Sequence, residues 1–216
     1  MTAAAHRPPL AHALAAWLRR LLAVLLAPLV VAGCAGTGTW APMEAVEAAR
    51  YAHPGAPEIA LITVVNNRTG SGDHTGLVVS GSERVLFDPA GRWEHPDAPE
   101  RGDVHFGMTP RMLRSYINMH ARETHHVIVQ RIAVSPEVAA LALRRVQDAG
   151  PVASAFCARA TGEVLRGLPG FEAIPVQWYP ITLSRAFGAL DGVETHVIRH
   201  DDDDVVARMD RAQAPL

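Results

Sequence analysis

The stretch that decides the fold is His74-Thr75-Gly76-Leu77-Val78-Val79-Ser80-Gly81-Ser82-Glu83-Arg84-Val85-Leu86-Phe87-Asp88. Residues 74–80 and 84–88 are apolar and β-branched, and Gly81-Ser82 between them is a tight-turn pair, which predicts an antiparallel hairpin. With the turn near residue 81, His74 lies opposite Asp88, although a shift of one residue would turn Asp88 to the other face. A carboxylate in that place would fix the imidazole tautomer and stabilise the imidazole cation.

Strand and helix patterns continue on both sides of this hairpin. Apolar, β-branched runs predict strands at residues 59–65, 126–134 and 193–198. Helices are predicted at residues 44–51, 110–123, 136–150 and 183–190, and the second and third of these start with Thr109-Pro110 and Ser135-Pro136, each a capping residue followed by proline. Strands joined as hairpins, with helices in separate runs, predict an α+β fold whose antiparallel sheet packs against helices.

A further helix is predicted around the single cysteine of the folded part, Cys157. Ser154 is the predicted N-cap and the helix runs to Leu165, so Cys157 is expected at the third helical position. The unpaired N–H groups and the dipole of a first turn favour thiolate over thiol, which is the setting of a nucleophilic cysteine. The alternative is a small apolar core residue, because free cysteine is among the most buried residue types.

The N-terminal part has the pattern of an export signal. Arginines precede a short apolar stretch at residues 21–31, which is too short for a bilayer core that needs about 20 residues. The stretch ends in Val31-Ala32-Gly33-Cys34, which resembles a bacterial lipobox. That resemblance implies cleavage before Cys34, lipidation of Cys34, and, because Ala35 follows, sorting to the outer membrane with the domain facing the periplasm. An ordinary cleaved signal with an incidental cysteine is the alternative.

These features divide the chain into four parts. We expect a signal peptide at residues 1–33, a lipidated tether at 34–43, the folded domain at 44–200 and an acidic tail at 201–216. The mature part has 17 arginines against 22 acidic residues, a formal charge of −5. Its arginines are scattered, so no nucleic-acid partner is predicted. The sequence does not indicate an oligomeric state.

The order of these residues resembles a known family. A strand that begins His-x-Gly-aliphatic, a polar residue on the next strand and a later cysteine that opens a helix are similar to the circularly permuted, NlpC-like branch of papain-fold cysteine hydrolases. Within it, the chain most resembles the YaeF/YiiX-like group, which includes lipoproteins. The resemblance covers residues 58–190 and implies Cys157 as nucleophile, His74 as base and Asp88 as the third polar residue. Many relatives have Asn before the cysteine, where this chain has Phe156.

The resemblance implies a cysteine peptidase or amidase that works through a thioester and needs no cofactor. In the cell envelope its substrate would be a peptide, such as a peptidoglycan stem peptide, or a lipid acyl group, and the sequence does not choose between them. A member of the same fold with an inactive pocket that binds a ligand or partner remains an alternative.

Two other classes of function are considered. A metal-dependent hydrolase could draw on the histidines outside the hairpin, although no His-Glu-x-x-His helix is present, and no metal site is predicted; these histidines are His95, His105, His120, His125 and His126. A structural lipoprotein could bind a partner through the loop at residues 89–108, with Trp93 and Phe106, although Trp93 in such a loop is more often an anchor on the core.

Overall fold

The computed structural model describes residues 17–22, 38–200 and 202 of the 216-residue chain. The chain divides into two compact units, residues 1–35 and residues 36–216. Residues 17–22 of the first unit are helical. Most of the predicted apolar stretch, and the lipobox with Cys34, lie outside the described residues. Among the residues that the structure describes, no helix has the length and apolar character needed to cross a membrane.

The second unit is built on a seven-stranded antiparallel sheet, which confirms the predicted α+β class. The strand order is β4-β5-β3-β2-β1-β6-β7. The strands are β1 (Glu58–Asn66), β2 (Gly72–Ser80), β3 (Arg84–Phe87), β4 (Glu100–Arg101), β5 (Val104–His105), β6 (His125–Ala133) and β7 (Glu194–Ile198). The sequence pattern missed β4 and β5 because two-residue strands are too short to show alternation.

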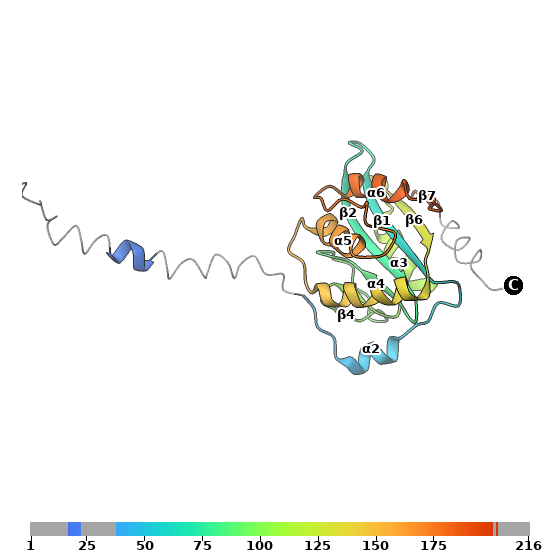
Figure 1. Ribbon diagram of the computed structural model, residues 1–216, viewed down its shortest axis with the longest axis horizontal. Coiled ribbons are helices and arrows are strands. Elements are labelled where there is room, and N and C mark those ends of the chain that lie inside the picture. Colours follow the sequence, from blue (N-terminus) through green and yellow to red (C-terminus); the bar gives the residue numbers. More distant parts are fainter. Residues whose placement is uncertain (1–16, 23–37, 201, 203–216) are drawn as a thin grey trace, which may run out of the picture. The chain divides into compact units, whose positions relative to one another are not determined.

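Helices cover both faces of this sheet (Figure 1). Along β1, Ile59 and Leu61 pack with the helices of one face, while Ala60 and Ile62 pack with the helix of the other. Successive side chains of a strand point to opposite faces, so a strand buried on both sides is apolar throughout. The first face carries α4 (Pro136–Ala149), α5 (Cys157–Arg166) and α6 (Pro180–Gly188), the second carries α3 (Pro110–His120), and α2 (Met43–Ala49) precedes the sheet.

Two of the predicted helix starts are confirmed. The Thr109 side chain accepts the N–H of Met112, and the Ser135 side chain accepts the N–H of Val138, with proline at the first helical position in both cases. These hydroxyls satisfy backbone donors that a helix leaves unpaired at its first turn.

The β2–β3 hairpin forms, but the predicted pairing of residue 74 with residue 88 is wrong. Ser80 pairs with Arg84 and Leu77 with Phe87, so the hairpin is centred on residue 82 and has a three-residue loop. The buried Arg84 guanidinium donates to the Ser80 hydroxyl across the last pair, which leaves Glu83 in the loop. Compared with the predicted register, this register shifts each cross-strand partner by two residues. A change of two preserves the face, so Asp88 stays on the face of His74.

The folded unit begins before the predicted boundary at residue 44. Trp40 forms a β-bridge with Arg101, and the N–H of Ala41 donates to the Glu100 carbonyl at 2.9 Å. The second half of the predicted tether is therefore attached to β4. In the predicted acidic tail, residues 201 and 203–216 lie outside the described residues.

The central strand allows a test of the core. Leu61 is fully buried, so Leu61→Ala should lower the free energy of unfolding by about 2–5 kcal/mol through lost burial and a residual cavity. Val197 on the outer strand β7 is 40% exposed, and Val197→Ala should change stability by less than about 0.5 kcal/mol. Urea unfolding measures both values; equal losses would place Leu61 outside the cooperative core.

Candidate active site

The site begins where β2 extends beyond its partner strand. The ladder with β3 covers residues 77–80 of β2, so His74 and Gly76 lie past the end of β3. Asp88 follows β3 directly and continues past the end of the ladder, along the same edge of β2. The Nε2 atom of His74 lies 2.6 Å from Oδ1 of Asp88, so the structure brings together the two residues that the hairpin pattern paired.

Asp88 is buried and has a second donor that the sequence did not indicate. The Tyr116 hydroxyl donates to the same Oδ1 atom at 2.6 Å. Burial alone raises the pKa of Asp88, but the hydrogen bond and charge of His74 and the Tyr116 hydroxyl outweigh it, so its pKa lies below the ordinary value. Asp88 is therefore a carboxylate that stabilises positive charge on His74.

Two glycines make room for this carboxylate and its donors. A Cβ at Gly76 would lie 2.7 Å from the Tyr116 hydroxyl, and a Cβ at Gly91 would lie 1.7 Å from Oδ2 of Asp88. The glycine of the His-x-Gly pattern thus admits the tyrosine that bonds Asp88. A larger residue at position 76 would have to displace that hydroxyl.

Cys157 is the first residue of α5, so the predicted cap at Ser154 and the third helical position are wrong. Residues 154–155 form a turn in which Ala155 has φ = 71° and the N–H of Phe156 donates to the Ala153 carbonyl. This left-handed residue reverses the chain just before the helix and prevents a helix start at Ser154. Cys157 consequently stands at the extreme end of the helix, where backbone N–H groups have no intrahelical acceptor.

Cys157 is 7% exposed, and His74 is the side chain that acts on its thiol. Burial raises its pKa, but the hydrogen bond and charge of His74 and the N–H groups of Thr75 and Ala158 outweigh this, so its pKa is lowered. Since Nε2 of His74 faces Asp88, Nδ1 is the nitrogen left for the sulfur. Burial lowers the pKa of His74, but Asp88 and Cys157 together raise it to about 10. These opposite shifts are those of a thiolate–imidazolium pair.

A second imidazole, His120, lies against His74. The two rings stack with centroids 5.7 Å apart and planes 13° apart, and His120 Nδ1–H donates to the Tyr116 carbonyl at 2.9 Å. Burial lowers the pKa of His120, and so does the charge of His74. A neutral ring on one face of His74 restricts its rotation. Tyr116 and His120 are four residues apart on a predicted helix, so their shared helix face was the available signal.

Asp103 connects the two halves of the site. Its carbonyl accepts the N–H of Asp88 at 2.8 Å, while its Oδ2 atom accepts the N–H of Ala90 at 2.9 Å and that of Val152 at 2.8 Å. Ala90 belongs to the turn after Asp88, and Val152 to the segment that leads to Cys157. Asp103 was missed because this role depends on backbone groups that are far apart in sequence.

The residues considered for a metal site and for a partner-binding loop have other contacts. No group of three or more His, Cys, Asp or Glu side chains that could hold a metal occurs among the described residues. His125 bonds Asp73 and His126 bonds Asn67, so these two imidazoles have separate partners. Trp93 and Phe106 are 4% and 6% exposed, so these two side chains are not available to a partner and Trp93 is an anchor on the core. Apolar burial pulls both side chains inward.

Comparison of the chain with family models, curated proteins and solved structures found no match in any of the three.

The Asp88–His74 pair should give a distinctive pH dependence of stability. In a Cys157→Ala background, which removes the third titrating group, Asp88→Asn should destabilise most between pH 3.8 and pH 6.5, the ordinary pKa values of the two groups. The lowered pKa of Asp88 gives a contribution to stability that is present above pH 3.8 and is lost as the pH falls through its folded pKa. The raised pKa of His74 gives a contribution to stability that is complete below pH 6.5 and is lost as the pH rises through its folded pKa.

Urea unfolding of the single and double variants from pH 3 to pH 10 provides the measurement. A difference in stability that does not change with pH would mean that the two groups are not coupled in the folded state.

Proposed function

We propose that this chain is a cysteine hydrolase that cleaves an amide or ester bond through a thioester on Cys157. The observation that carries the proposal is the buried His74–Asp88 hydrogen bond beside the start of α5, where burial raises the pKa of the Cys157 thiol but the neighbouring His74 imidazole lowers it. A nucleophile, a base and a group that orients the base are the three parts that nucleophilic acyl transfer requires.

Each proton in the proposed reaction has a stated place. The Cys157 thiolate attacks the carbonyl carbon, and the C=O π electrons move to the oxygen. As the tetrahedral adduct collapses, Nδ1–H of the His74 imidazolium protonates the leaving amine or alcohol. The neutral imidazole then takes a proton from water, whose oxygen attacks the thioester, and the sulfur leaves as thiolate beside the renewed imidazolium.

The helix start can also stabilise the oxyanion of that adduct. The N–H of Cys157, at the first helical position, has no acceptor within α5. One such donor is typically worth about 2.7–4 kcal/mol in the transition state. The N–H groups of Thr75 and Ala158 lower the pKa of the Cys157 thiol, so they favour the thiolate itself.

We further propose that the fold is the circularly permuted papain-like, NlpC-like fold. The support is the order of parts, in which an antiparallel strand pair with His74 precedes the helix that Cys157 opens, and this helix packs on the sheet. Asp88 takes the place of the third polar residue, and Phe156 remains a difference from many relatives.

The lipobox supports a location in the bacterial cell envelope. Acyl chains on Cys34 would hold the domain at the outer membrane, facing the periplasm. Peptidoglycan peptides and lipid acyl groups are the substrates within reach there, and the proposal covers both.

The reactivity of Cys157 tests its electronic state without a substrate. In a Cys34→Ala protein, iodoacetamide should alkylate Cys157 well below the pH of about 8.5 at which an ordinary thiol ionises. His74→Ala should move the midpoint up to or beyond that value, because the cation that favours the thiolate is lost. A wild-type midpoint near 8.5 would contradict the proposed nucleophile.

Activity should follow the same residues. Against a panel of peptidoglycan fragments and acyl esters, Cys157→Ala should abolish hydrolysis, a loss of about 10⁴-fold or more, and Asp88→Asn should reduce it by about 10²–10⁴-fold. A covalent acyl adduct on Cys157, seen by mass spectrometry, identifies the cleaved bond. If a panel member binds without turnover while Cys157 still shows a low alkylation midpoint, the chain is a binding protein instead. If chelation abolishes activity and Cys157→Ala does not change it, the chain is a metal enzyme.

A further inference from the structure

A β-bulge lies immediately before His74. In the ladder with β1, His74 pairs with Val64 but Gly72 pairs with Val65, so Asp73 is the extra residue on β2. A bulge bends its strand and turns the side chains that follow, and such irregularities occur often beside active sites. The direction of His74 therefore depends on the conformation of Asp73.

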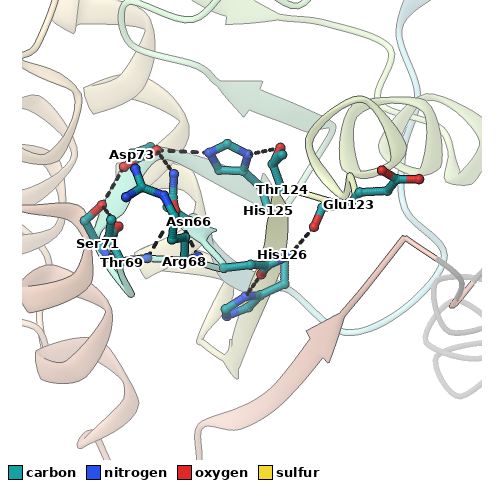
Figure 2. Close-up of polar contacts among 10 residues, drawn as sticks. Asn66, Arg68, Thr69, Ser71, Asp73, Glu123, Thr124, His125 and His126 are labelled. Atoms are coloured by element: carbon teal, nitrogen blue, oxygen red, sulfur yellow. Dashed lines mark hydrogen bonds and ion pairs between the residues drawn. The ribbon is translucent and has the colours of Figure 1, made fainter.

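The Asp73 carboxylate is held from three directions, as Figure 2 shows. Ser71 donates its hydroxyl to Oδ1 at 2.9 Å, and Oδ2 accepts from Asn66 Nδ2 at 3.4 Å and from His125 Nε2 at 3.0 Å. His125 is held in turn, because its Nδ1 lies 2.8 Å from the Thr124 hydroxyl. With Nε2 as donor and Nδ1 as acceptor, both ring nitrogens have a partner.

These contacts cross the central strand. Asn66 ends β1, and on its other side it pairs with His125, the first residue of β6. The His125–Asp73 bond therefore connects β6 to the bulge of β2 over the end of β1. The bulge is therefore fixed both to β1, the neighbour of β2, and to β6, the next strand beyond β1.

Stability alone does not account for this arrangement. The side chains of Asp73 and His125 are 42% and 26% exposed, and even a fully charged pair of that exposure would contribute little to folding. Their effect is instead on geometry, because they restrict the one irregular residue next to the base.

We propose that Asp73, held by Asn66, Ser71 and His125, is a positioning residue that fixes the bulge and thereby directs the His74 imidazole toward Cys157. This inference rests on the proposed thiol chemistry of Cys157. Asp73 acts through the backbone of His74 and does not touch the reacting atoms.

The pH midpoint of Cys157 alkylation tests the inference, because a merely structural role for Asp73 would leave it unchanged. In the full chain carrying Cys34→Ala, Asp73→Ala should raise the midpoint by about one pH unit, and alkylation below both midpoints should be about tenfold slower. His125→Ala should act in the same direction, and His125→Gln, which retains an N–H donor, should restore most of the rate.

The matched control is His126→Ala. His126 Nδ1 lies 2.7 Å from Oδ1 of Asn67, a contact that joins the same loop to the same strand without touching Asp73. This variant should keep the wild-type midpoint. An equal shift in His126→Ala would show a general effect of the loop and overturn the inference.

The possible failures are separable. A low wild-type midpoint that stays unchanged in both Asp73→Ala and His125→Ala overturns the positioning role alone. A wild-type midpoint near that of an ordinary thiol overturns the proposed function as well. If Asp73→Ala does not fold, His125→Ala decides, and failure of His125→Gln to restore a lost rate counts against the hydrogen bond.

Discussion

The site depends on one interaction, the buried bond between the Asp88 carboxylate and the His74 imidazole. A carboxylate taken out of water costs several kcal/mol unless charge and hydrogen bonds compensate it. His74 and Tyr116 both bond its Oδ1 atom, and Gly76 and Gly91 allow the close approach. Positive charge on His74 then stabilises the Cys157 thiolate, so the state of the sulfur follows from the burial of a carboxylate on another strand.

The side chains of the candidate site come from both faces of the sheet. His74, Asp88 and Tyr116 belong to the side of α3, whereas Cys157 opens α5 on the opposite side. They come together past the end of β3, where β2 continues without that partner and the Thr75 N–H lowers the pKa of the Cys157 thiol. A longer β3 would occupy this edge. The short strand is therefore a requirement of the site.

Much of the fold was predictable because its signals are local. The apolar runs of β1, β2 and β6, and the hydroxyl-proline starts at Thr109 and Ser135, depend only on neighbouring residues. The errors have a shared cause. The start of α5 depends on a left-handed turn at Ala155, and the hairpin register on the buried Arg84–Ser80 contact, and neither can be read from the local pattern.

The sequence by itself determined which residues can form the candidate site, because alternation along the hairpin keeps His74 and Asp88 on one face even when the register moves by two. It also determined that Cys157 belongs to a helix start. Only the tertiary structure decided that this helix end reaches His74, and that Tyr116, His120 and Asp103 join it. Such contacts join residues as far apart in the chain as His74 and Cys157, and their geometry is set by packing of the whole sheet against both layers of helices.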